Sequence, residues 1–150
     1  QQILGYNYRL SDIHSALGLS QLKKTSEFVD KRNKIANNYN SELKNLPVHL
    51  PYILDGNRSS YHLYIIRVMT EKIKISHREI HLKLIEKGIK VNLHYYPVHL
   101  QPFYRSLGFK EGMFPISEKY AQQAISIPIF PGLTESQQSY VVEEITKLLN

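Results

Sequence analysis

Prolines divide this 150-residue chain into segments that can and cannot form long helices. Proline fixes φ and lacks a backbone N–H, so it interrupts helix interiors and central strands. Pro47 and Pro51 require an extended or turning segment, and Pro128 and Pro131 interrupt an apolar stretch near the end of the sequence. The longer helices are therefore expected before Pro47, between Pro51 and the Pro-rich stretch that begins at Pro97, and after Pro131.

The first of these segments has a helical pattern from Leu10 to Leu43. Ser11 and Asp12 suit its N-terminus. We expect two consecutive helices, or one helix broken near Lys24, with Thr25 or Ser26 as the second cap. An apolar-to-small stripe at helical spacing marks the first helix and is formed by Ile13, Ala16, Leu17 and Ser20.

A strand–helix–strand pattern follows. Residues 61–68 are rich in β-branched and aromatic side chains, which favours a strand. A capping box over 76–79 opens a helix that runs through Ile85, and Gly88 is its expected stop. Residues 89–93 alternate in polarity and predict a second strand, so the run has the size of a compact α+β unit.

The last third of the chain predicts short elements and one longer helix. We expect a short helix over 103–107 and another over 117–123 with Pro115 in its first turn. The two prolines within 125–132 predict an edge strand or an irregular extended piece. A second capping box, over 134–137, opens a terminal helix. The fold class predicted from these patterns is α+β.

The composition of the chain excludes several kinds of site and several classes of protein. The chain has no cysteine, which excludes a disulfide framework, a thiolate metal site and a cysteine nucleophile. Its apolar runs are far shorter than the roughly 20 residues that a membrane helix needs. Gln1-Gln2-Ile3-Leu4 resembles no signal peptide and lacks an initiator methionine. We therefore expect a soluble, cytoplasmic piece of a longer protein, without a membrane partner.

The net charge of +6 could attract nucleic acid, an acidic membrane surface or a phosphorylated small molecule. No nucleic-acid-binding motif is evident, so we expect no nucleic-acid partner, and a basic binding domain that contacts nucleic acid is the alternative function. The basic residues are spread in small groups typical of solvated helix faces and strand ends: Lys23-Lys24, Lys31 to Lys34 with Arg32, Lys72 and Lys74, and Lys83 to Lys90.

His77 and His81 lie four residues apart on the predicted helix, a spacing that a zinc site could use. The order His-Arg-Glu-Ile-His differs from the motif of zinc proteases, and no third ligand is evident. We therefore expect two partly exposed histidines and no metal.

Two stretches are candidate binding sites. The first, residues 92–102, places tyrosines and histidines in a loop after a strand, which suits sugar or nucleotide recognition, although a structural aromatic cluster is equally possible. A strand ending at Leu93 would turn His94 and Tyr95 to opposite faces.

The second candidate binding site, residues 5–9, precedes a helix N-terminus. There Asn7 and Arg9 could hold an anion, or Arg9 could pair with Asp12.

Three stretches resemble the DegT/StrS family of sugar aminotransferases. Residues 5–22 resemble the stretch after the family's cofactor lysine, 94–102 its substrate loop, and 127–134 its closing segment before the last helix. Within the family, residues 91–102 are most similar to the UDP-sugar transaminases of pseudaminic acid synthesis.

The resemblance implies the type I fold of pyridoxal-phosphate (PLP) enzymes, of which this chain would be the C-terminal part. Residues 1–46 would form a helical segment between domains, and 47–150 the small C-terminal α+β domain. The cofactor lysine would lie upstream, so no catalytic residue is expected in this chain and the fragment alone should not transaminate.

Individual roles also follow from the resemblance. Asn7 would reach the PLP phosphate and substrate of the other subunit in a homodimer, and Arg9 is a weaker candidate for substrate binding. The loop residues Asn92, His94, Tyr95 and Tyr96 would face a nucleotide sugar. Glutamate would donate its amine, through PLP, to C4 of a UDP-linked 4-keto-6-deoxy sugar.

Overall fold

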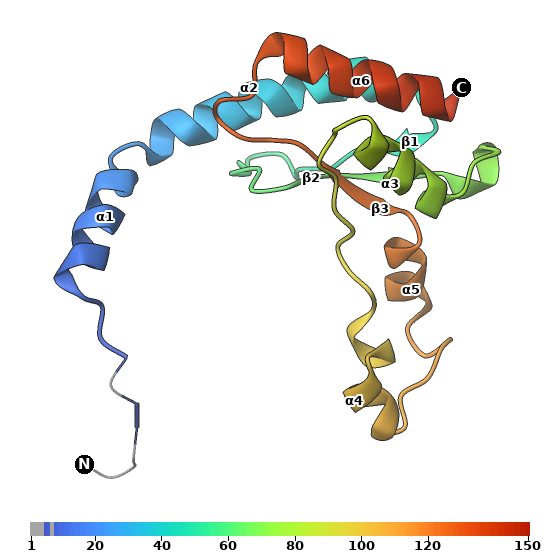
Figure 1. The fold of residues 1–150 in the computed structure, drawn as a ribbon, viewed down its shortest axis with the longest axis horizontal. Coiled ribbons are helices and arrows are strands. Elements are labelled where there is room, and N and C mark those ends of the chain that lie inside the picture. Colours follow the sequence, from blue (N-terminus) through green and yellow to red (C-terminus); the bar gives the residue numbers. More distant parts are fainter. Residues whose placement is uncertain (1–4, 7) are drawn as a thin grey trace.

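The computed structural model describes residues 5–6 and 8–150, and its helices and strands are interleaved along the chain (Figure 1). The helices are α1 (Asp12–Leu22), α2 (Thr25–Leu43), α3 (His77–Glu86), α4 (Pro102–Ser106), α5 (Pro115–Ala121) and α6 (Glu135–Leu149). The strands are β1 (Val48–His49), β2 (Tyr64–Val68) and β3 (Ala124–Ile127). Short 3-10 turns occupy Thr70–Lys72 and Val98–Leu100. This mixture confirms the predicted α+β class.

The strands form an antiparallel sheet in the order β1-β2-β3. Tyr64 of β2 is paired with Ile127 of β3. The other edge of β3 is also used, because Ser126 forms an antiparallel bridge with Asn92. The amide of Ser126 donates to the Asn92 carbonyl at 2.9 Å, and the amide of Asn92 donates back at 3.2 Å. β3 is therefore paired on both sides at Ser126.

The predicted strand over 89–93 is wrong except for this bridge. The amide of Leu93 donates to Oδ1 of Asn92 at 2.9 Å instead of to a neighbouring strand, so the ladder ends there. The stretch over 125–132, predicted to be an edge strand or an irregular extended piece, begins with a fully buried strand, β3, which is the last strand in the sheet order. The irregular part starts at Pro128, which has no N–H to extend the pairing.

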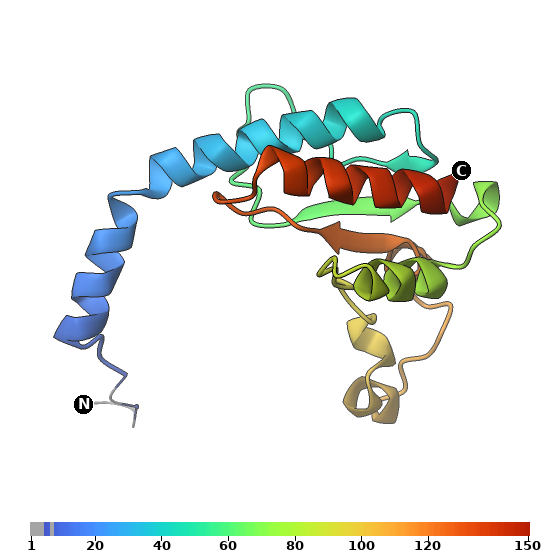
Figure 2. The same ribbon diagram turned by 45° about the horizontal axis from the view of Figure 1, so that its top comes forward.

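One core joins the sheet and three helices. Tyr64, Ile66 and Val68 alternate toward the buried face of β2. α6 contacts both α2 and α3, and Figures 1 and 2 show α2 and α6 side by side along the sheet. The helical side chains in the core are Ile35, Ala36, Tyr39 and Leu43 of α2, Ile80 and Leu84 of α3, and Val141, Ile145 and Leu149 of α6.

α1 stands apart from this core. None of its residues is buried, and the predicted apolar stripe faces solvent, with Ile13 82% exposed. The second half of α2, in contrast, packs in the core. The domain boundary that we place between residues 46 and 47 stays a prediction. Of the helices in the described part of the chain, none is both long and apolar enough to span a membrane.

The helix caps show which local signals are reliable. Ser11 caps α1, and both predicted capping boxes, at Ser76 and Thr134, are present. The predicted cap of α2 by Thr25 or Ser26 is wrong. The preceding residue is Lys24, whose backbone is helical rather than extended, so the two helices meet in a tight bend that leaves no place for a side-chain cap.

Arg32 of α2 joins the segment that precedes β2 to the segment that follows β3, at one end of this strand pair. Its Nη1 donates to the carbonyls of Ile129 at 2.8 Å, Tyr61 at 2.9 Å and His62 at 3.2 Å. These bonds explain why the strand predicted from Tyr61 begins only at Tyr64, since two of its carbonyls face a side chain instead of a ladder. Arg32 is thus a structural cation and not the solvated charge that we expected.

We predict that Arg32→Met lowers the free energy of unfolding by about 1.5–3 kcal/mol, because three carbonyls lose a charged donor. Chemical denaturation followed by circular dichroism measures this change. The matched control is Lys34→Met, two residues along α2, whose exposed ammonium pairs with Glu135 at 3.3 Å. The control should change stability by less than about 0.5 kcal/mol. Equal losses in the two variants would contradict the assignment.

Candidate functional site

The loop after Asn92 is anchored to the buried strand β3 by a serine. Oγ of Ser126 donates to the carbonyl of Asn92 at 3.2 Å and lies 2.8 Å from Nε2 of His94. Ser126 is itself buried. The start of the candidate substrate loop is therefore fixed by side-chain contacts as well as by the backbone bridge.

Two tyrosines follow this anchor and face outward. Tyr95 is 69% exposed and Tyr96 is 55% exposed, whereas His94 is half-buried. The rings of His94 and Tyr95 meet edge to face, with centroids 4.5 Å apart. His94 is thus turned toward β3 and Tyr95 toward the open side, so the two side chains face opposite ways as expected, although the strand pairing itself ends at Asn92. The loop therefore combines both alternatives. The ring of His94 is packed against β3, whereas the rings of Tyr95 and Tyr96 are exposed.

A pocket of about 370 Å³ lies beside these tyrosines. It is open to one side and combines aromatic faces with one guanidinium and two carboxylates. Its walls come from the start of α3, the loop, α4 and α5, and consist of His77, Leu93, Tyr95, Tyr96, Pro97, Leu100, Arg105, Glu111, Glu118, Ala121 and Gln122. Such a mixture suits a polar ligand that carries a flat ring and an anionic group.

Sequence reasoning missed Arg105 in this pocket. The residue lies on α4, and its Nη2 donates to the hydroxyl of Tyr96 at 3.5 Å. A guanidinium beside a phenol offers several hydrogen-bond donors to a phosphate or carboxylate. The sequence signal was weak, because one arginine in a short helix after Pro102 has no characteristic spacing to the tyrosines.

Residues 97–122, here called the arm, carry α4 and α5 and project from the sheet on the side away from α2 and α6 (Figures 1 and 2). A buried pair braces the arm: Nε2 of His99 lies 2.8 Å from Oε1 of Glu118. The amide of Gly112 donates to both oxygens of Glu118, at 2.9 and 3.0 Å. Gly112, His99 and the Phe114 amide hold the pKa of Glu118 below its usual value, although partial burial opposes them.

Comparisons with known proteins identify the fold that carries this pocket. Residues 1–146 match the DegT/DnrJ/EryC1/StrS aminotransferase family. The chain belongs to this family. The resemblance of its three motifs to DegT/StrS sequences is thereby confirmed.

Solved and curated members support the assignment. Helicobacter pylori PseC, an aminotransferase involved in the biosynthesis of pseudoaminic acid, is 29% identical with a TM-score of 0.89 over 99% of this chain and 40% of that one. The PLP form of Spr1654 from Streptococcus pneumoniae is 28% identical, with a TM-score of 0.84 over 95% and 37%. The GDP-perosamine synthase of Escherichia coli O157:H7 is 30% identical over 97% and 38%. This DegT/StrS chain thus spans about two-fifths of the length of its relatives.

The remaining predicted site residues are Asn7, Arg9 and Asn92, and neither Arg9 nor Asn92 is among the described residues that line the pocket. Asn7 lies outside the described residues. Arg9 precedes α1, and α1 lies away from the arm in both views (Figures 1 and 2). Asn92 is next to the pocket, but its Oδ1 is engaged with the Leu93 amide. The proposed substrate-binding roles of Asn7, Arg9 and Asn92 stay predictions for this family member.

The two helix histidines take part in packing. Nε2 of His77 donates to the carbonyl of Ala124 in β3 at 3.1 Å, and burial lowers the pKa of His77. Both His77 and His81 are half-buried. The described residues contain no group of three or more His, Asp or Glu side chains that could hold a metal ion.

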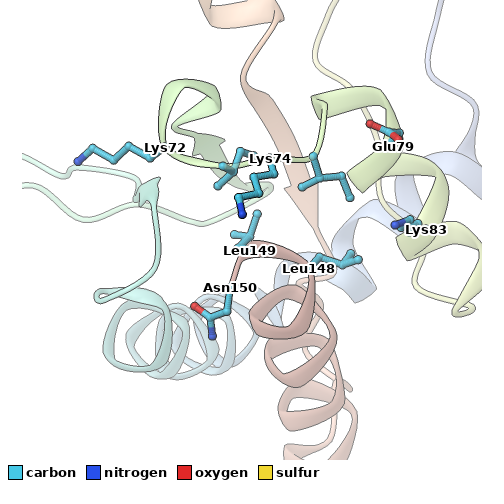
Figure 3. Close-up of a pocket in the computed structure, with 9 residues that line it drawn as sticks. Lys72, Lys74, Glu79, Lys83, Leu148, Leu149 and Asn150 are labelled. Atoms are coloured by element: carbon cyan, nitrogen blue, oxygen red, sulfur yellow. The ribbon is translucent and has the colours of Figure 1, made fainter.

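A second cavity, also of about 370 Å³, lies where α6 ends beside α3 (Figure 3). Lys72, Lys74 and Lys83 line it together with Asn150. Figure 3 shows that the three lysine side chains point in different directions, with Lys72 directed away from the other two. They build no common anion site, in agreement with the solvated positions expected for these lysines.

We predict that the arm loosens in acid. Because the pKa of Glu118 is lowered in the folded protein, its ionised carboxylate stabilises the arm at pH values above 4.5, the usual pKa of the group. This stabilisation is lost as the pH falls below 4.5 through the folded pKa. Limited proteolysis of the arm, from about pH 6 to about pH 3, measures the transition.

Glu118→Gln tests the source of this transition, since it removes the titrating carboxylate. The arm of the variant should be cleaved faster at neutral pH and show a flatter pH dependence. Glu111→Gln, which removes an exposed carboxylate of the same arm, serves as the control and should retain the wild-type profile. An unchanged acid transition in Glu118→Gln would exclude Glu118 as its cause.

Proposed function

We propose that the protein to which this chain belongs is a PLP-dependent nucleotide-sugar aminotransferase. It transfers the amino group of glutamate to C4 of a UDP-linked 4-keto-6-deoxy sugar, in pseudaminic acid or related surface-glycan synthesis. The match of residues 1–146 to the DegT/DnrJ/EryC1/StrS family carries this proposal. The likeness to PseC supports the choice of substrate. A homodimer and a cytoplasmic location belong to the same proposal.

In this proposal the described residues bind and orient the sugar nucleotide. The exposed faces of Tyr95 and Tyr96 offer stacking surfaces, and their hydroxyls can bond to sugar hydroxyls. Arg105, beside Tyr96, would hold the diphosphate with its planar guanidinium. Glu118 is occupied by His99 and Gly112, so it does not compete for Arg105.

PLP supplies the amine-transfer chemistry when it is bound. By the resemblance, the family's cofactor lysine precedes the stretch that residues 5–22 match, and no lysine of this chain stands in such a motif. We therefore assign substrate orientation and specificity to this chain, and cofactor attachment to the part of the protein that corresponds to the rest of its relatives. The contact of Asn7 with the PLP phosphate across a homodimer interface remains part of the proposal.

We predict that the 150-residue chain, mixed with PLP and reduced with borohydride, carries no stoichiometric adduct on one defined lysine. The reason is that no lysine of this chain stands in the cofactor-lysine motif that the resemblance implies. Peptide mass spectrometry measures the adduct, and the full-length protein is the positive control. A single fully modified lysine in the short chain would contradict the assignment of cofactor attachment to the rest of the protein.

We further predict that Tyr95→Phe in the full-length enzyme slows the sugar half-reaction and spares the glutamate half-reaction. Loss of one hydrogen bond to the bound sugar nucleotide should reduce the single-turnover rate or affinity about two- to hundredfold. Glutamate exchange involves neither the sugar nor the nucleotide, so its rate should stay at the wild-type value. Single-turnover kinetics of each half-reaction separate the two effects.

Tyr52→Phe provides the matched control, because Tyr52 is 79% exposed and lies in the loop between β1 and β2. It should leave both half-reactions unchanged. Equal losses in both half-reactions for Tyr95→Phe would show that the loop has a structural role. A wild-type enzyme that exchanges glutamate but aminates no UDP-linked keto-sugar would refute the proposed substrate and leave the family intact.

A further inference from the structure

A relay of contacts connects the buried strand β3 to the wall of the tyrosine pocket. Ser126 is 6% exposed, and its Oγ lies 2.8 Å from Nε2 of His94. The His94 ring meets the Tyr95 ring edge to face at 4.5 Å. Tyr95 is the outermost member and lines the pocket. Exposure thus rises along the relay from a buried serine, through a half-buried histidine, to an exposed tyrosine.

The hydrogen-bond donors fix the protonation pattern of this relay. A serine hydroxyl has one proton, and that of Ser126 is donated to the Asn92 carbonyl at 3.2 Å. Both contacts of the hydroxyl are satisfied when it accepts its second bond from Nε2–H of His94. The opposite arrangement would give up the bond to Asn92. We therefore assign the Nε2–H tautomer to His94.

The bond to Ser126 fixes the orientation of the His94 ring, because the other ring nitrogen forms no hydrogen bond with the described residues. Nδ1 is buried, and the described residues offer it no hydrogen-bond partner. The contact with Ser126 is then the polar contact that sets the rotation of the ring. Without it, the imidazole would lose its fixed orientation, and the edge presented to Tyr95 would change with it.

We propose that Ser126 and His94 are positioning residues that hold the Tyr95 ring against the pocket for the nucleotide sugar. This inference rests on the proposed function for its kinetic consequences, whereas its geometric consequences are independent of the substrate. An exposed tyrosine samples several rotamers, and an edge-to-face contact with an immobilised ring restricts them. The buried strand thereby sets the pose of a side chain that touches the substrate.

The test uses the full-length holoenzyme with Ser126→Ala and His94→Phe, alone and combined. Ser126→Ala removes only the hydroxyl and leaves the backbone pairing of Ser126 with Asn92 in place. His94→Phe keeps an aromatic ring beside Tyr95 but cannot bond to Ser126. Ser139→Ala, an exposed serine of α6, is the control and should behave as wild type in every measurement.

Three results are expected. The ¹⁵N spectrum of wild-type His94 shows the Nε2–H tautomer, and Ser126→Ala loses this signature and shifts the Tyr95 ring resonances. Ser126→Ala lowers the sugar half-reaction about two- to tenfold and spares the glutamate half-reaction. The double variant loses no more than the larger single loss, because both changes interrupt one relay.

The opposite results would overturn the inference. Unchanged Tyr95 resonances in Ser126→Ala would show that the serine does not position the tyrosine. Equal losses in both half-reactions, or additive losses in the double variant, would show a general structural effect. If the enzyme aminates no sugar at all, the proposed function fails, and the tautomer and Tyr95 resonances still decide for or against the relay.

Discussion

The pairing of β3 on both of its edges holds together parts of the chain that lie far apart in sequence. One edge continues the sheet through β2, and the other bridges to Asn92 at the start of the tyrosine loop. Ile125 and Ile127 flank Ser126, so a slip of one residue would place an isoleucine where His94 needs a hydroxyl. The register of a single buried strand therefore determines both the core and the geometry of the candidate site.

Side chains from two helices reinforce this strand beyond its own ladder. His77 of α3 donates to the carbonyl of Ala124 at the start of β3. Tyr39 of α2 donates to the carbonyl of Pro128 just after it, at 2.9 Å, and burial raises the pKa of Tyr39 so that its hydroxyl stays protonated. Arg32 binds the next carbonyl, that of Ile129. Backbone carbonyls at the start of β3 and just after it thus accept hydrogen bonds from helix side chains, as buried polar groups require.

Much of the fold could be predicted from the sequence wherever the deciding contact is local. Both capping boxes were identified correctly because each is contained in four consecutive residues. Arg32 was misjudged because one of its acceptors, Ile129, lies 97 residues away. The strand at 89–93 was predicted from polarity alternation. This pattern carries no information on the side-chain oxygen of Asn92, which accepts the hydrogen bond from the Leu93 amide. The apolar stripe on α1 was identified from its helical spacing, but this spacing does not show which part of the protein would cover the stripe.

The candidate site shows the same limit at the scale of single side chains. The resemblance to DegT/StrS sequences located the loop, but His94 turns inward while Tyr95 faces the pocket because Ser126, 32 residues beyond His94, offers a buried acceptor. This arrangement separates two tasks that adjacent residues perform. In the proposed function, His94 and Ser126 maintain the position of the loop, so substitutions at Tyr95 or Tyr96 would change the ligand without disturbing the strand beneath. A pocket built in this way allows substrate preference to differ among enzymes that share one fold.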